Sequence, residues 1–251
     1  MVSRNFGLIG YPLSHSFSKA YFTEKFVREG ISGCQYDLYP IAHIDLLTHL
    51  VGENKQLEGL NVTIPYKVAV LPFLNELDAA AAFIGAVNCI SIRYTDGKPF
   101  LKGYNTDAHG FEESLKPFLK AHHQKALIFG DGGAAKAVKY VLQKLGIAYL
   151  SVTRAATSGA IRYEEVTEEV LKEYTVLINT TPLGMSPNVD SCPPIPYQNL
   201  STQHLAYDLV YNPEESKFLK HAKDKGAVIK NGLEMLDLQA ARSWVIWNSS
   251  Y

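Results

Sequence analysis

The chain has 251 residues, which is enough for one large domain or two medium-sized ones. Its apolar fraction of 47% and its charged fraction of 20% are ordinary for a globular protein. The formal net charge is −1 and no long run of like charge occurs, which argues against a general nucleic-acid-binding protein and a polybasic membrane anchor.

The N-terminal segment has neither the long apolar stretch nor the small-residue cleavage site of a signal peptide. No apolar stretch reaches about 18 residues, so we expect no transmembrane helix. The three cysteines, Cys34, Cys89 and Cys192, are odd in number, far apart and without a CxxC pair. This usage is typical of reduced thiols, so we expect a cytoplasmic protein.

The first half of the chain alternates short apolar runs with segments of helical periodicity. We predict strands at residues 6–10, 34–41 and 59–65, and helices at 19–30, 42–53 and 68–85, the last interrupted by Pro72. The turn sequence TDGK predicts a hairpin of residues 86–94 and 99–105, and a helix at 107–119 leads out of this unit.

From about residue 124 the alternation resumes. We predict strands at 125–130, 147–154, 175–180 and 205–211, and helices at 131–146, 163–174, 215–226 and 231–247. Such alternation is typical of a parallel sheet with helices on both faces. The predicted fold class is therefore α/β, with two α/β domains and an active-site cleft between them. Residues 1–107, completed by the apolar final helix at about 232–251, form one domain, and residues 108–231 form the other.

A glycine-rich turn follows the strand at 125–130. Gly130, Gly132 and Ala135 have the G-x-G-x-x-G/A spacing between a strand and a helix, which favours a Rossmann-type dinucleotide site over an ordinary tight turn. Glycines let the backbone approach a pyrophosphate, and the helix N-terminus supplies N–H groups. Asp131 places a carboxylate in this turn, and we expect it to point to solvent.

The second strand of this domain ends in SVTRAATS. An acid that would bind the ribose hydroxyls of NAD is missing there, and Arg154 occupies the tip. A guanidinium suits a 2′-phosphate, so the sequence favours NADP over NAD. The alternative is that Arg154 is a solvated loop cation.

A lysine follows another strand end in the first domain. Pro65 ends the apolar run of residues 62–64, and Lys67 follows at the rim of the sheet, where loops carry functional groups. Asn88 offers a donor and an acceptor for a hydroxyl ligand, and Asp107 opens a predicted helix. Lys67 is alternatively a surface lysine, and Asp107 a helix N-cap.

Serine hydroxyls follow the first strand. Ser16 and Ser18 lie two residues apart, so both face the same way in an extended segment, where they suit a carboxylate. The alternative is that these serines cap the following helix.

The segments that carry these residues belong to a series of motifs in the order found in the shikimate dehydrogenase family. The chain resembles this family over nearly its whole length. The matching motifs are GYPLSHSFS, NVTIPYK, GAVNCI, GYNTD, GDGGAAKA, INTTPLGM, DLVYNP and GLEMLDLQAA. Eight ordered motifs are far more specific than any one of them.

The resemblance implies a function and a set of site residues. It implies NADP-dependent reduction of 3-dehydroshikimate to shikimate, in the pathway to chorismate and aromatic amino acids, by a cytoplasmic monomer or homodimer. The small-molecule substrate would be bound by Ser16, Ser18, Thr63, Asn88, Gln239 and the nearby Tyr211. Lys67 and Asp107 would be the catalytic pair. The cofactor would be bound by Gly130, Gly132, Gly133, Ala134, Ala135, Thr153, Arg154, Thr180 and Met185.

The chain departs from the family pattern at the cofactor site. Ser158 stands where a second basic residue often falls, and Asp131 replaces a small residue in the glycine-rich turn. The alternatives are an NAD-using quinate/shikimate dehydrogenase and a non-catalytic ligand-sensing module on the same fold. The presence of Lys67 and Asp107 argues against a sensor, because a sensor does not need a pair of residues for proton transfer. We expect no metal, because the eight histidines form no ligand spacing such as HExxH.

Overall fold

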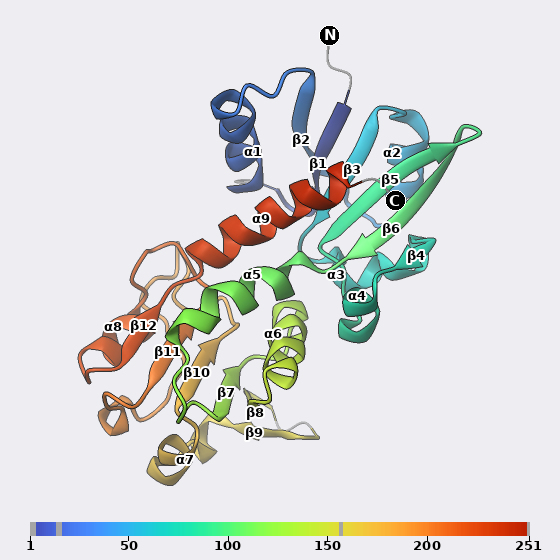
Figure 1. Ribbon diagram of the computed structural model, residues 1–251. Helices are drawn as coiled ribbons and strands as arrows, with labels where there is room; N and C mark the ends of the chain where they lie inside the picture. Colours follow the sequence, from blue (N-terminus) through green and yellow to red (C-terminus); the bar gives the residue numbers. More distant parts are fainter. Residues whose placement is uncertain (1–3, 14–16, 156–157, 250–251) are drawn as a thin grey trace. The chain divides into compact units, whose positions relative to one another are not determined.

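The computed structural model describes residues 4–13, 17–155 and 158–249 (Figure 1). The chain divides into two compact units, a first unit of residues 1–107 with 239–251 and a second unit of residues 108–238. Each unit is an α/β structure built on its own six-stranded sheet. The chain passes from one unit to the other within two helices, α5 (Thr106–Leu115) and α9 (Leu233–Asn248).

The sheet of the first unit is mixed and has the strand order β2-β1-β3-β5-β6-β4. Its strands are β1 (Arg4–Gly10), β2 (Cys34–Pro40), β3 (Leu57–Val62), β4 (Glu76–Leu77), β5 (Cys89–Thr95) and β6 (Lys98–Tyr104). The first three are parallel, and β5 runs antiparallel to both β3 and β6. The predicted hairpin is therefore confirmed. Asp96 and Gly97 at its tip both have positive φ, as a two-residue hairpin turn requires.

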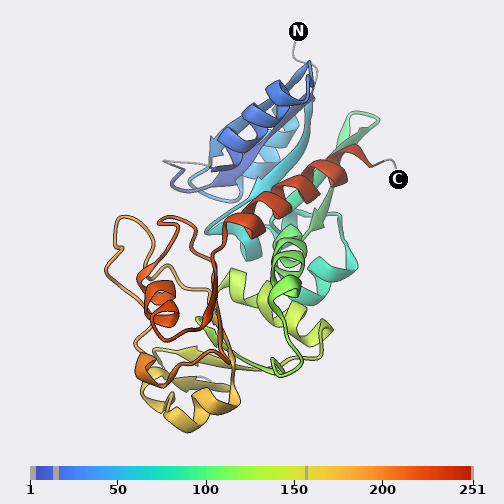
Figure 2. The same cartoon turned by 60° about the vertical axis from the view of Figure 1, so that its left-hand side comes forward.

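Helices cover both faces of this sheet, and Figure 2 shows α1 and α9 along it. On one face, α1 (Phe17–Arg28) and the C-terminal part of α9 share an aromatic cluster in which Phe22 lies 5.3 Å from Trp247 between ring centroids. The indole Nε1 of Trp247 donates a hydrogen bond to the Ile90 carbonyl at 3.0 Å. On the other face lie α2 (Leu46–Glu53), α3 (Tyr66–Ala69) and α4 (Ala79–Ile84).

The predicted helix at 68–85 was wrong in extent. The structure has α3, a 3₁₀ turn at Leu71–Phe73, strand β4 and helix α4 in this segment. Pro72 lies within the 3₁₀ turn, and β4 pairs with β6. The Asp78 carboxylate accepts a hydrogen bond from the Ala81 N–H at 2.8 Å and so begins a new helix.

The sheet of the second unit is parallel throughout and has the order β12-β11-β10-β7-β8-β9. Its strands are β7 (Lys125–Phe129), β8 (Ala148–Thr153), β9 (Ala160–Arg162), β10 (Val176–Asn179), β11 (Leu205–Asp208) and β12 (Val228–Lys230). Strands β9 and β12 were not predicted, because three residues are too few for a periodic pattern. The strand order reverses between β7 and β10, and ligands of such sheets bind outside the carboxyl ends at this point.

Helices also cover both faces of the second sheet. Helix α7 (Glu168–Glu173) and helix α8 (Lys217–Lys223) pack on one face, where Leu171 and Phe218 are fully buried. On the other face, Phe111 of α5 lies edge-on against Tyr207 of β11 with ring centroids 5.0 Å apart. Helix α6 (Gly133–Lys144) follows β7 directly, as predicted. Among the residues described, no helix combines the length and the apolarity needed to cross a bilayer.

Candidate active site

Backbone pairing in the first unit brings three separate segments together. The Val62 N–H donates to the Asn88 carbonyl at 2.8 Å, and the Asn88 N–H donates to the Tyr104 carbonyl at 3.1 Å. The Val87 N–H donates to the Lys67 carbonyl at 2.7 Å. The ends of β3 and β6 and the start of β5 thus lie side by side, so the residues that follow them share one rim of the sheet.

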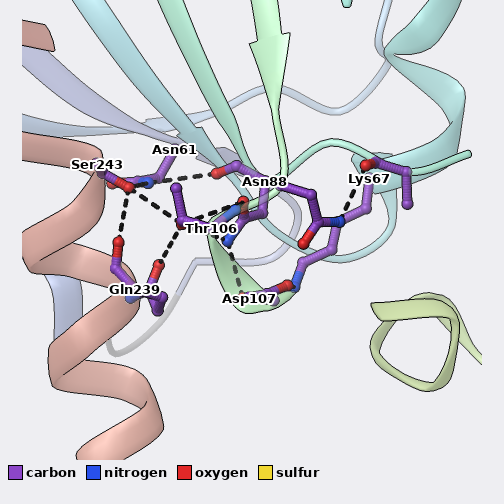
Figure 3. A network of polar contacts seen from close by, with 9 residues as sticks. Asn61, Lys67, Asn88, Thr106, Asp107, Gln239 and Ser243 are labelled. Atoms are coloured by element: carbon purple, nitrogen blue, oxygen red, sulfur yellow. Dashed lines mark hydrogen bonds and ion pairs between the residues drawn. The ribbon is translucent and has the colours of Figure 1, made fainter. Parts of the chain in front are cut away.

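Lys67 and Asp107 form an ion pair at this rim, with Nζ 2.6 Å from Oδ2 (Figure 3). The other carboxylate oxygen, Oδ1, accepts a hydrogen bond from the Asn88 amide at 2.8 Å. The side chain of Asp107 is 10% exposed and that of Lys67 is 21% exposed. Because both carboxylate oxygens are bound, the carboxylate is held in one orientation toward the lysine. Lys67 remains accessible enough to meet a ligand.

Thr106 extends this arrangement into the interior. Its N–H donates to the Asn88 side-chain oxygen at 2.6 Å, and its hydroxyl accepts from the Asn88 amide at 3.0 Å. The same hydroxyl lies 3.4 Å from Oε1 of Gln239, which comes from α9. The structure therefore brings Gln239, 133 residues away, to the predicted catalytic pair (Figure 3).

Sequence reasoning missed two buried members of this network, Asn61 and Ser243. The Asn61 amide donates to the Ser243 hydroxyl at 2.9 Å, and that hydroxyl lies 3.3 Å from the Thr106 hydroxyl. Ser243 also donates to the Gln239 carbonyl at 3.0 Å. A polar residue within the buried strand β3, and a serine one helical turn after Gln239, were the available signals.

The remaining predicted substrate residues of the first unit lie near the carboxyl ends of β1 and β3. Ser16 falls outside the described residues. Ser18 is half-buried within α1, and its hydroxyl interacts with that of Tyr36, whose pKa burial raises well above its usual value. Because Ser18 lies inside the helix, it is not the N-cap. Thr63 is half-buried just beyond β3, and its N–H donates to the Ile9 carbonyl at 3.0 Å.

The glycine-rich turn of the second unit has the shape that a pyrophosphate requires. Gly130 has φ of +100°, and an added Cβ would lie 2.9 Å from both Thr180 Oγ1 and Thr181 Cγ2. At Gly132 an added Cβ would meet nothing within 4 Å, and no side chain caps α6 there. The N–H groups of Gly133 and Ala134 begin the helix beside this open space, so the site fits a phosphate-containing cofactor.

The tip of β8 lies next to this turn. The Gly130 N–H donates to the Val152 carbonyl at 2.9 Å, so the residues after each strand leave the sheet at the same edge. Thr153 is half-buried and bonds through its hydroxyl to the Ala155 carbonyl at 2.7 Å, and Arg154 is exposed. Ala135 is fully buried where α6 packs on the sheet.

Asp131, which we expected to point to solvent, is exposed and also forms an ion pair. Its Oδ1 lies 2.5 Å from Nζ of Lys139, and the carboxylate side chain is 49% exposed. The carboxylate is therefore at the surface, as expected, and has a lysine as its partner. Lys139, two turns into α6, was not recognised from the sequence.

The loop after β10 carries Thr180 and Met185. Thr180 bonds through its hydroxyl to the Phe129 carbonyl at 2.7 Å, which ties the loop to the end of β7. Met185 is exposed. Tyr211 follows β11, and 36% of its surface is exposed. Burial of the remainder raises the pKa of its hydroxyl.

A buried carboxyl supports the same loop. Asp208, at the end of β11, accepts hydrogen bonds from the Asn179 amide at 2.9 Å, from the Val210 N–H at 3.0 Å and from the Ser216 hydroxyl at 2.5 Å. Burial raises the pKa of Asp208 from 3.8 to about 6, although the hydrogen bonds act to lower it. Asn179 in turn accepts from the Thr181 hydroxyl at 2.6 Å. The described residues include no group of three or more His, Cys, Asp or Glu that could hold a metal ion.

The family model of the shikimate dehydrogenase substrate-binding domain matches residues 8–90. The shikimate dehydrogenase (NADP(+)) of Desulforamulus reducens is 35% identical, over 96% of this chain and 88% of its own. That of Carboxydothermus hydrogenoformans is 37% identical, over 96% and 90%. The structure of the Thermus thermophilus enzyme in complex with NADP(H) and shikimate is 30% identical, with a TM-score of 0.82 over 98% of this chain and 93% of that one. With such identity over nearly its full length, the chain belongs to the shikimate dehydrogenase family.

Proposed function

We propose that the protein catalyses the reversible NADPH-dependent reduction of 3-dehydroshikimate to shikimate, a step toward chorismate and the aromatic amino acids. The observation that carries this proposal is the Lys67–Asp107 ion pair, held at a sheet rim by buried Asn88 and Thr106. The named relatives, which cover nearly the whole chain, support the same reaction.

The reaction needs a hydride and a proton, and the chain supplies the means to move the proton. Bound NADPH supplies the hydride to the ketone carbon. The Lys67 ammonium donates a hydrogen bond to the carbonyl oxygen as negative charge develops there, and then delivers its proton. In the reverse direction neutral Lys67 accepts the proton of the alcohol. Asp107 Oδ2, 2.6 Å from Nζ, holds the lysine in place for both directions.

Substrate recognition is assigned chiefly to the first unit. Ser16 and Ser18 bind the carboxylate, and Thr63, Asn88 and Gln239 bind ring hydroxyls. Tyr211 is assigned to substrate binding as well. The amide groups of Asn88 and Gln239 support this assignment, because they are buried and anchored through Thr106. Fixed amides present a donor and an acceptor without the cost of ordering them on binding.

Cofactor binding is assigned to the second unit, within residues 108 to about 231. Gly130, Gly132, Gly133, Ala134 and Ala135 hold the pyrophosphate, Thr153 and Arg154 contact the 2′-phosphate side, and Thr180 and Met185 lie on the nicotinamide side. The open space above Gly132 and the uncapped start of α6 support the first assignment. Arg154 is exposed at the tip of β8, and this tip lies next to the turn, which supports NADP over NAD.

We also propose that the enzyme acts in the cytoplasm as a monomer or homodimer on a small molecule, without a nucleic-acid partner. Its three unpaired cysteines and its net charge of −1 support this.

One assay tests the proposed function. The purified protein is given shikimate with NADP and with NAD in parallel, and quinate replaces shikimate in matched reactions. We expect turnover with shikimate and a higher kcat/KM with NADP than with NAD. Binding of shikimate without turnover would support a ligand-sensing module instead, and equal use of quinate with NAD would support a quinate/shikimate dehydrogenase.

A further inference from the structure

An ion pair joins the glycine-rich turn to the helix that follows it. Asp131 lies between Gly130 and Gly132, and its carboxylate is 2.5 Å from the ammonium of Lys139. Lys139 is six residues after Gly133, where α6 begins, or about 9 Å along the helix axis. Side chains on a helix lean toward its N-terminus, so Lys139 extends back along α6 and its charge ends at the turn.

The same edge of the sheet receives the tip of β8. Phe129 pairs with Val152 in register, and the Gly130 N–H donates to the Val152 carbonyl at 2.9 Å. Neighbouring strands lie about 4.8 Å apart. Asp131 and Arg154 therefore follow adjacent strand ends, and Lys139 brings a second positive charge to this edge.

The charges at this edge decide which cofactor it favours. A phosphate monoester carries roughly −1.5 to −2 at neutral pH, whereas the ribose of NAD has neutral hydroxyls. With Arg154 and Asp131 alone, the formal charges at the edge would cancel, and the carboxylate would repel a 2′-phosphate. Lys139 restores a net positive charge of one. Ser158, beyond the tip of β8, contributes no charge.

We propose that Lys139 is the second cation of the 2′-phosphate site, in the role that a basic residue at position 158 would have. Asp131 holds Lys139 at this edge, and its negative charge limits the preference for NADP. On NADP binding, the phosphate oxygens accept hydrogen bonds from Lys139 and Arg154. With NAD, Lys139 stays on Asp131. This inference rests on the proposed NADP-binding function of the second unit and names the residues that set its specificity.

The test compares dissociation constants of NADP and NAD, measured by calorimetry on the full chain without substrate. Lys139→Met should weaken NADP binding about tenfold and change NAD binding less than about twofold, because one charge-assisted contact is lost. Asp131→Asn should strengthen NADP binding relative to NAD. The NADP loss in Lys139→Met should shrink at high salt, since the pair lies at the surface.

A matched control and a double variant make the test specific. Lys125 forms an ion pair with Glu173 at the opposite end of β7, so Lys125→Met should leave both dissociation constants unchanged. In Asp131→Asn/Lys139→Met, NADP binding should still be several-fold weaker than in Asp131→Asn alone, because Lys139 contacts the phosphate itself. Melting temperatures establish that each variant is folded.

Four results overturn the inference. Equal weakening of NADP and NAD by Lys139→Met would make Lys139 a support of the turn. Loss of the Lys139→Met effect in the Asp131→Asn background would mean that Lys139 only neutralises the carboxylate. Unchanged NADP binding in Lys139→Met would overturn this inference but not the proposed function. A wild-type protein that binds neither cofactor would overturn both.

Discussion

Asn88 and Asp107 are joined by a 2.8 Å hydrogen bond from the asparagine amide to Oδ1, the carboxylate oxygen that Lys67 does not contact. This hydrogen bond fixes Asp107, the acid of the proposed catalytic pair, through the oxygen that faces away from the lysine. The Asn88 amide does not ionise, so its capacity to donate this hydrogen bond does not change with pH. Under the proposed mechanism, Asn88 thus orients the carboxylate that holds Lys67 and takes no part in proton transfer itself.

Lys67→Ala should reduce kcat by a factor on the order of 10²–10⁴, because a positioned general acid and base is lost. Shikimate binding should change much less. Steady-state kinetics and shikimate titration measure the two effects. Lys102→Ala is the control, because Lys102 forms a comparable ion pair with Glu76 in the same unit, at 2.5 Å. Wild-type turnover in Lys67→Ala would exclude Lys67 from the mechanism.

Ser243→Ala should lower kcat/KM several-fold and the free energy of unfolding by about 1–3 kcal/mol, since it removes the buried hydrogen bonds that Ser243 makes with Asn61 and Thr106. Kinetics and urea unfolding measure these effects. Ser249→Ala is the control on the same stretch of chain, because Ser249 is exposed and its hydroxyl donates to the nearby Val245 carbonyl. Unchanged kinetics in a destabilised Ser243→Ala would confine Ser243 to a structural role.

Arg154→Ala should reduce the preference for NADP over NAD about tenfold or more, because it removes a charge-assisted contact to the 2′-phosphate. Ser158→Arg should raise the preference by adding a cation beyond the tip of β8. Titration of each cofactor against wild type and both variants measures the change. Equal losses of NADP and NAD binding in Arg154→Ala would show that the arginine supports the loop.

Asp208→Asn should alter the pH dependence of stability. The folded-state pKa of Asp208 is raised from 3.8 to about 6, so the folded protein holds this proton more tightly than the unfolded chain does. The resulting stability is fully present below about pH 4 and is lost as pH rises through 6. Between pH 5 and 7.5, the unfolding free energy of wild type minus that of Asp208→Asn should fall by about 1.4 kcal/mol. Urea unfolding at these pH values measures it, and a constant difference would contradict the expected titration.

Gly59→Ala should destabilise the first unit by about 1–3 kcal/mol, because the added Cβ would overlap the buried indole of Trp247. Thermal and urea unfolding measure the loss. Gly52→Ala in α2 is the matched control: its Cβ would meet nothing within 4 Å, so it should be neutral or stabilising by about 0.4–1 kcal/mol. Equal effects of the two substitutions would contradict close packing of α9 on β3.

Much of the fold follows from local patterns. The sequence Asp96-Gly97 predicts the β5–β6 hairpin, because a two-residue hairpin turn needs positive φ at both positions and an Asp-Gly pair adopts it readily. The glycine-rich turn predicts the β7–α6 junction for a similar reason. The segment at 68–85 was misjudged because the pairing of β4 with β6, a contact distant in sequence, overrides its helical periodicity.

The sequence by itself determined the order of most strands and helices, the glycine-rich turn and, through eight ordered motifs, the family. These depend on short-range backbone preferences and on residue identity. The tertiary structure alone decided which polar groups meet. It buried Asn61 beside Ser243 and brought Gln239 to Thr106. It also turned Lys139 back to Asp131. Partners of this kind depend on strand pairing, on the return of α9 to the first unit and on side-chain direction, and no local pattern in the chain encodes them.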